Sequence, residues 1–193
     1  MDLAIKLIVL LPLVAAAIAG LFCRVIGDRP AQIVTTAALL ISAALSVFLF
    51  AKIGFGPENA KAFTVKLFTW MDSGTFDVSW ALRVDTLTVV MLIVVTGVSS
   101  MVHLYSIGYM AEDPSIPRFM SYLSLFTFFM LMLVTSDNLV QLFFGWEGVG
   151  LASYLLIGFW YEKKSANDAA MKAFIVNRVG DFGFALGIFA VWM

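Results

Sequence analysis

The side chain that stands out in this sequence is a glutamate inside a long apolar run. Residues 137–160 read DNLVQLFFGWEGVGLASYLLIGFW, and Glu147 is the only charge after Asp137. In a helix that begins at Leu139, a rise of about 1.5 Å per residue puts Glu147 roughly 12 Å into a hydrocarbon layer about 30 Å thick. A carboxylate at that depth is costly, so it should face the protein interior or water. Proton exchange is the chemistry open to it, and the alternative is a hydrogen-bonded carboxylate that only fixes helix packing.

The next apolar run holds further charges, Lys172, Arg178 and Asp181. Arg178 and Asp181 are spaced i and i+3, so on a helix they share a face and can pair. The two runs are joined by a short loop and should be antiparallel, which puts Asp181 at the depth of Glu147 and Arg178 about one turn away. We expect this cluster to set the proton affinity of Glu147. The alternative is an Arg178–Asp181 pair that only locks helix register.

Other polar residues are weaker candidates. Lys172 is within reach of the membrane interface by snorkelling, so the default interpretation is a topology anchor. His103 is the only histidine, and a packing residue with satisfied hydrogen bonds is a better interpretation than a proton relay. Asp85 and Asp137 precede apolar runs, where aspartate caps free N–H groups of a helix.

The elements that position these residues are predicted to be membrane helices. The chain has 62% hydrophobic and 13% charged residues and a mean hydropathy of +0.97, far from the composition of soluble proteins. We predict an all-α integral membrane protein, with 1–193 as a single membrane domain. About six apolar runs are long enough to span a bilayer, at Leu3–Phe22, Ile33–Ile53, Leu87–Tyr109, Phe119–Val134, 139–160 and Ala169–Trp192. A turn is expected at Cys23–Pro30 between the first two.

Small residues line one face of the predicted helix that contains Glu147, which favours close packing of a neighbouring helix. Gly145, Gly148 and Ala152 fall at i, i+3 and i+7, which gives a smooth surface for a neighbouring helix. Gly150 and Tyr154 lie on the Glu147 side and leave room for another helix or for water.

The loop 54–85, between the second and third runs, is predicted to lie outside the membrane. It contains two segments of alternating apolar residues, 63–67 and 76–82, separated by the turn signal Met71-Asp72-Ser73-Gly74. This pattern is typical of a β-hairpin. Because an isolated hairpin is marginal in water, it should pack on its neighbours.

Composition argues against several classes of function. The formal net charge is −1, which argues against nucleic acid as a partner. The chain has a single cysteine, Cys23, and a single histidine, so haem, iron–sulfur and zinc sites lack ligands. We therefore expect no cofactor and no metal in this chain, and no Gly-rich phosphate loop is visible.

Charges in the short loops predict the orientation. The first, third and fifth runs are followed by basic residues, which are Arg24, Arg29, Arg118, Lys163 and Lys164. The turn after the fourth run has none. We therefore expect the amino terminus and the hairpin on the periplasmic side or its equivalent.

Two stretches carry a family resemblance. GWEGVGLASYLLIGFW (residues 145–160) and AAMKAFIVNRVGDFGF (residues 169–184) closely resemble the L-chain family of bacterial NADH-quinone oxidoreductase, respiratory complex I. The mitochondrial counterpart is NADH dehydrogenase subunit 5. LRVDTLTVVMLIVVTGVSSMVHLYSIGYM and RFMSYLSLF are similar to the same family, so the resemblance covers nearly the whole chain.

The resemblance implies a proton-translocating subunit with an antiporter-like fold of inverted helical repeats. It implies that Glu147 is the protonatable residue and that Arg178 and Asp181 are the pair of the NRVGD motif. NADH oxidation, flavin, iron–sulfur clusters and quinone reduction belong to other subunits, so the redox chemistry lies outside this chain. The implied partners are other membrane-arm subunits and the lipid bilayer, in the bacterial inner or the mitochondrial inner membrane.

The sequence is shorter than the family pattern, because the second repeat and the lateral helix are missing. We therefore expect an amino-terminal fragment of a longer subunit. Two other classes stay open, a subunit of a multisubunit Na⁺/H⁺ antiporter and a structural membrane-arm module.

Overall fold

The computed structural model describes residues 1–54, 62–74 and 76–192; residues 55–61 of the predicted loop lie outside that part. In chain order the elements are α1 (Asp2–Leu21), α2 (Cys23–Ile26), α3 (Asp28–Gly54), β1 (Phe63–Ser73), β2 (Phe76–Val84), α4 (Thr86–Tyr109), α5 (Ile116–Val134), α6 (Leu139–Ile157) and α7 (Lys164–Trp192).

Six of these helices are long and apolar enough to cross a membrane, as the sequence predicted. Two helices begin before their predicted apolar spans, because hydropathy locates the apolar span and not the polar turn before it. α3 begins at Asp28, where an acidic side chain suits a helix amino terminus, and α7 begins at Lys164. The predicted turn Cys23–Pro30 contains the short helix α2 and ends where Gly27 adopts φ +77°.

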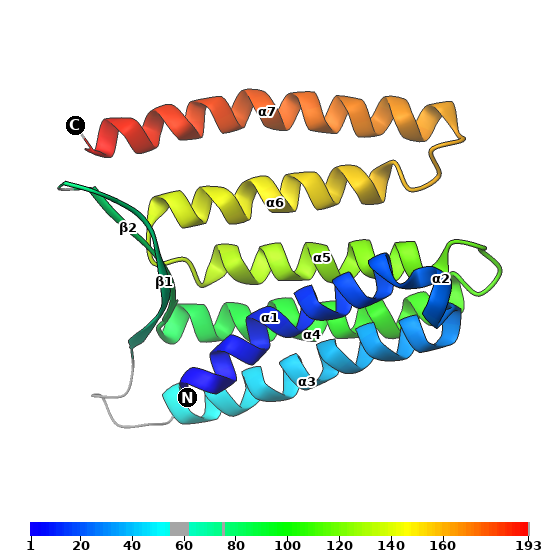
Figure 1. Ribbon diagram of the computed structural model, residues 1–193, viewed down its shortest axis with the longest axis horizontal. Coiled ribbons are helices and arrows are strands. Elements are labelled where there is room, and N and C mark those ends of the chain that lie inside the picture. The colour runs from blue at the N-terminus through cyan, green and yellow to red at the C-terminus, as the bar shows by residue number, and fades with distance from the viewer. Residues whose placement is uncertain (55–61, 75, 193) are drawn as a thin grey trace.

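The helices form a bundle (Figure 1), in which α6 and α7 are less buried than the other long helices. α1, α3, α4 and α5 pack on one another, and α6 and then α7 extend the bundle beyond α5. The core lies in the first group, where Ile8, Leu49, Leu92 and Leu131 are fully buried. Interhelical hydroxyl bonds join the helices, with Ser121 Oγ donating to the Ala16 carbonyl at 2.7 Å. Only 11% of the α7 span is buried, so α7 is attached along one side alone.

The hairpin is antiparallel, as predicted, and covers one end of the bundle (Figure 1). The predicted turn at 71–74 was placed too early, because β1 continues through Ser73 and the chain turns at Gly74, where φ is +64°. A glycine suits that position because a Cβ makes positive φ unfavourable.

The hairpin packs on the α5–α6 connection, which confirms the expectation that it needs a neighbour. The backbone N–H of Arg83 donates to the Thr135 carbonyl at 2.8 Å, and the Ala81 N–H donates to Oε1 of the buried Gln141 at 3.0 Å. Asn138 Nδ2 donates to the Ser79 carbonyl at 2.8 Å. These bonds fix β2 to the start of α6, the helix that carries Glu147.

The two aspartate caps have different outcomes. Asp85 accepts a bond from the Thr88 backbone N–H at 2.8 Å, which confirms the cap on α4. That bond, with a smaller contribution from Arg83, holds the pKa of Asp85 below its ordinary value. The prediction for Asp137 was wrong: Asn138 caps α6 through the Gln141 N–H at 2.8 Å. Asparagine and aspartate are both good N-caps, so residue type alone could not decide which of the two neighbouring residues caps α6.

Candidate functional site

The site is built on the face of α6 that points away from α5. On the opposite face, Gly145 and Gly148 are buried against α5, as the spacing of small residues predicted. A Cβ at Gly145 would lie 2.7 Å from the Leu133 Cα, and one at Gly148 would overlap the Phe129 ring. The absence of side chains lets the two backbones approach closely. Glu147 is thereby directed toward α7.

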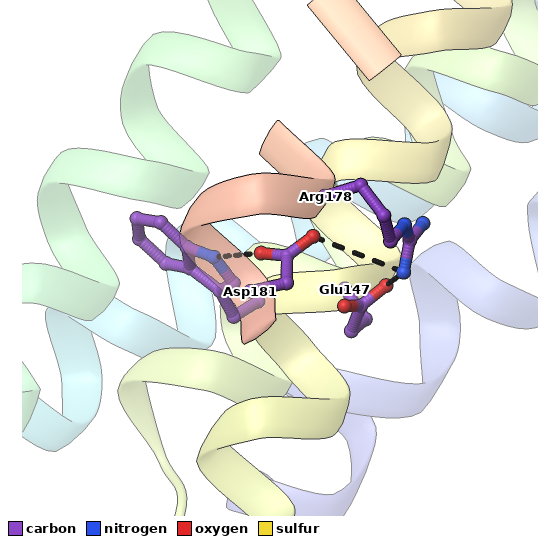
Figure 2. A network of polar contacts seen from close by, with 4 residues as sticks. Glu147, Arg178 and Asp181 are labelled. Carbon is purple, nitrogen blue, oxygen red and sulfur yellow. Dashed lines mark hydrogen bonds and ion pairs between the residues drawn. The ribbon is translucent and has the colours of Figure 1, made fainter. Parts of the chain in front are cut away.

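Three charged side chains meet between α6 and α7 (Figure 2). Arg178 on α7 donates a hydrogen bond to the Glu147 carboxylate and forms an ion pair with it. Arg178 also lies 3.8 Å from Oδ2 of Asp181, one turn further along its own helix. The arginine is therefore placed between two carboxylates from different helices.

This geometry confirms that the three predicted charges lie together, and it adds a second pairing. The i, i+3 spacing predicted that Arg178 can pair with Asp181, and this contact is present at 3.8 Å. The shorter contact is the one with Glu147, because the α6–α7 interface brings the two side chains end to end, whereas Asp181 lies beside the guanidinium. The i, i+3 spacing could not indicate this cross-helix contact.

Asp181 has a second partner that the sequence analysis missed. The indole N–H of Trp146 donates to Oδ1 of Asp181 at 2.8 Å, from the residue that precedes Glu147. The Asp181 side chain is only 7% exposed, against 22% for Glu147 and 48% for Arg178. The indole N–H of a tryptophan in a membrane helix needs a hydrogen-bond acceptor. This requirement is the feature of the sequence from which a polar partner of Trp146 could have been expected. The cluster thus has two carboxylates, one guanidinium and one indole donor.

Space adjoins the cluster on the Asp181 side. A cavity of about 410 Å³ lies between α5, α6 and α7, and its lining includes Leu133, Trp146, Asn177, Asp181 and Phe184. On the other side, the Phe174 ring lies under the Arg178 guanidinium at 4.6 Å and contacts Tyr154 at 5.4 Å. The ion cluster therefore has a cavity on one side and an aromatic pair on the other.

The two weaker candidates lie elsewhere. His103 on α4 is fully buried; Nδ1 lies 2.8 Å from the Ser99 carbonyl and Nε2 lies 3.0 Å from Ser124 Oγ. A carbonyl only accepts, so Nδ1 carries a proton. α5 lies between α4 and α6 (Figure 1), so the structure does not bring His103 to the cluster. Lys172 is exposed on α7 and, within residues 1–54, 62–74 and 76–192, has no carboxylate within ion-pair distance.

The described part of the chain offers no metal site. Within it, no group of three His, Cys, Asp or Glu side chains is placed to hold a metal ion. Glu147 and Asp181 both lie within ion-pair distance of Arg178. The arrangement can exchange a proton or shift an ion pair between partners.

Two family models match the chain. One, described as NADH-Ubiquinone oxidoreductase (complex I), chain 5 N-terminus, matches residues 70–120. The other, described as NADH:quinone oxidoreductase/Mrp antiporter, TM, matches residues 136–193. The second contains all three charged residues of the cluster.

Curated relatives match nearly the whole chain. NADH-quinone oxidoreductase subunit L of Rickettsia conorii is 56% identical over 185 residues, which are 96% of this chain and 28% of the relative. NADH-ubiquinone oxidoreductase chain 5 of Triticum aestivum is 58% identical over 183 residues, 95% of this chain and 27% of the relative.

Solved structures confirm the fold. A chain of the membrane-bound sulfane sulfur reductase, an archaeal respiratory membrane complex, superposes with a TM-score of 0.81 at 17% identity, covering 97% of this chain and 36% of that one. A chain of the Mrp complex from Dietzia sp. DQ12-45-1b gives 0.76 at 25% identity, covering 94% and 18%. Helices, hairpin and neighbours together show a multi-pass membrane protein with an antiporter-like fold. The resemblance found in the sequence is thereby confirmed: the chain is related to subunit L of NADH-quinone oxidoreductase and chain 5 of NADH-ubiquinone oxidoreductase, and it spans about 28% of the length of such relatives.

Proposed function

We propose that this chain is part of an antiporter-like subunit that translocates protons in an NADH:quinone oxidoreductase, with Glu147 as the proton carrier. The observation that carries the proposal is the Glu147–Arg178–Asp181 cluster, in which one cation is shared by two carboxylates between two membrane helices. The relatives named subunit L and chain 5 support the assignment to this complex.

The cluster suggests how the site works. An adjacent cation favours the ionised form of a carboxylate, and loss of that cation favours the protonated form. Arg178 contacts Glu147 and has Asp181 at 3.8 Å, so a small movement of its guanidinium exchanges one partner for the other. Transfer of Arg178 toward Asp181 would let Glu147 take up a proton, and its return would expel that proton. Trp146 holds the Asp181 carboxylate in place for this exchange.

Energy for that movement comes from elsewhere in the proposed complex. NADH oxidation and quinone reduction, with their flavin and iron–sulfur clusters, are assigned to other subunits. Other membrane-arm subunits and the bilayer are the proposed partners, in a bacterial inner or mitochondrial inner membrane. We further propose that residues 1–193 act as one membrane domain, with the amino terminus and the hairpin on the periplasmic side.

The alternative is a subunit of a multisubunit Na⁺/H⁺ antiporter. The likeness to a chain of an Mrp complex and the family model that covers both kinds of protein favour it. The identity of 56–58% to subunit L and chain 5 relatives favours the oxidoreductase. In a structural membrane-arm module, the shared arginine would only link α6 to α7, and loss of the Glu147 charge would leave pumping unchanged.

Co-purification separates these functions. The complete subunit, tagged and purified from its native membrane, is expected to carry NADH:quinone oxidoreductase activity with it. If the purified subunit instead carries Na⁺/H⁺ exchange activity and no NADH oxidation, the antiporter alternative replaces the proposal.

A further inference from the structure

A second cavity lies at the end of the bundle opposite the hairpin, and none of the three charged residues of the Glu147 cluster lines it. It has a volume of about 490 Å³ and is enclosed by the start of α5, the end of α6 and the start of α7. Arg118 is its only charged lining residue among the described residues. Three phenols and an amide share the lining, and the apolar remainder comes from residues such as Leu155 and Met171; the polar members are Tyr122, Tyr154, Tyr161 and Asn167.

Arg118 is held in place but keeps hydrogen-bonding capacity. Its Nη2 donates to the Phe159 carbonyl at 3.2 Å. Its guanidinium stacks over the rings of Phe159 and Tyr161, at 4.6 and 5.1 Å from their centroids. Nε is buried and has no hydrogen-bond partner in the described part of the chain. A buried guanidinium donor without a partner is unfavourable, and because Arg118 lines the cavity, an acceptor bound there would compensate its charge.

The acidic side chains of the adjoining cavity form no ion pair with this arginine. Asp113 lies in the adjoining cavity, where Oδ1 accepts from the Ser115 N–H at 2.8 Å and Oδ2 accepts from the Trp160 indole at 3.0 Å. No carboxylate among the described residues lies within ion-pair distance of Arg118. Glu162 and Lys163 also line the adjoining cavity, and their charges offset each other.

The surroundings indicate the kind of ligand. Tyrosine and tryptophan gather at the membrane–water interface, and this end of the bundle has Trp160 and three tyrosines beside the cavity. A guanidinium fork and phenol donors suit phosphoryl oxygens, while Leu155 and Met171 suit the glycerol and acyl part of a lipid. Basic pockets between membrane helices bind lipid headgroups. We propose that this cavity binds the phosphate group of an anionic phospholipid, with Arg118 as the principal contact.

Photolabelling of the complete complex tests the proposal. The complex is placed in phosphatidylcholine nanodiscs that contain a photoreactive phosphatidylglycerol, and labelled peptides are mapped. Wild type is expected to be labelled in the peptides around Arg118 and 154–171. Arg118→Gln should lower that labelling about tenfold, since charge-assisted hydrogen bonds are lost. The matched control is Lys164→Gln, which removes an exposed cation that lines neither cavity and should leave the labelling unchanged.

A second variant covers the case in which Arg118→Gln fails to assemble. Met171→Trp partly fills the cavity while leaving Arg118 and its bond to Phe159 intact, and it should also abolish the localised label. The proposal is overturned if wild type shows no label there, because Arg118 would then only cap the Phe159 carbonyl. Equal losses of label in Arg118→Gln and Lys164→Gln would show that labelling depends on the overall surface charge, which would also overturn the proposal. Full displacement of the label by excess inorganic phosphate would indicate a site for free phosphate instead of a lipid.

Discussion

The Arg178 guanidinium donates a hydrogen bond to the Glu147 carboxylate, so a cation of α7 is paired with an anion of α6 (Figure 2). Neither helix alone contains this pair, although Asp181 lies on the same helix as Arg178. The packing of α7 on α6 therefore decides which carboxylate Arg178 contacts.

The first prediction concerns the energetic coupling of this pair. Glu147→Gln and Arg178→Gln should each lower the Tm of the purified complete complex, because each removes the ion pair that joins α6 to α7. The double variant should lie closer to wild type than the sum of the single effects, with a coupling of about 1 kcal/mol. As the control, Lys172→Gln combined with Glu147→Gln should be additive. If the effects of Glu147→Gln and Arg178→Gln on Tm are additive in the double variant, the contact between the two side chains contributes nothing to stability.

The second prediction concerns the packing of α6 on α5. Gly148→Ala should lower the thermal stability markedly, because the added Cβ would overlap the Phe129 ring. Gly150→Ala, two residues along, is the control: the nearest atom to its Cβ would be Asn177 Nδ2 at 3.8 Å. That variant should be neutral or gain roughly 0.5–1 kcal/mol of helix propensity. Equal stability of the two variants would contradict the close approach of the helices.

The helices and the charge cluster differ in how far the sequence could specify them. Long apolar runs define membrane helices without knowledge of their neighbours, and the alternation of Phe63, Val65 and Leu67 defines a strand in the same way. The Glu147–Arg178 contact depends on rotation and depth of two helices, which local spacing leaves open. The bond from Trp146 to Asp181 has the same dependence. Only the packing of α6 and α7 fixes either one.

The third prediction concerns the pH dependence of stability at Asp85. The Thr88 N–H keeps the pKa of Asp85 below its ordinary value of 3.8. The ionised cap therefore stabilises the folded state fully above about pH 4, and this contribution is lost as the pH falls through the lower folded pKa. Asp85→Ala should cost about 1 kcal/mol at neutral pH, measured by thermal unfolding. Asp85→Asn can still cap, so its own stability should lack this acid step; an unchanged acid profile in Asp85→Asn would assign the step to another group.

The fourth prediction concerns orientation. In a Cys23→Ser background, single cysteines at the exposed Ser73 and Ser165 should react with an impermeant thiol reagent from opposite sides of the membrane. The hairpin position should be labelled from the periplasmic side, and Ser165, at the start of α7 next to the α6–α7 loop, from the cytoplasmic or matrix side. The hairpin lies at one end of the bundle and that loop at the other (Figure 1). Labelling of both from one side would contradict the proposed topology.

Proton pumping by Glu147→Gln in reconstituted vesicles tests the central proposal most directly. The amide retains the size and hydrogen-bonding groups of the side chain but cannot ionise, so the complex should assemble while pumping falls at least about tenfold. Glu147→Asp keeps the charge with a shorter reach and should retain more activity, and Glu162→Gln should pump as wild type does. A correctly assembled Glu147→Gln complex that pumps at the wild-type rate would show that Glu147 only fixes the packing of α6 against α7.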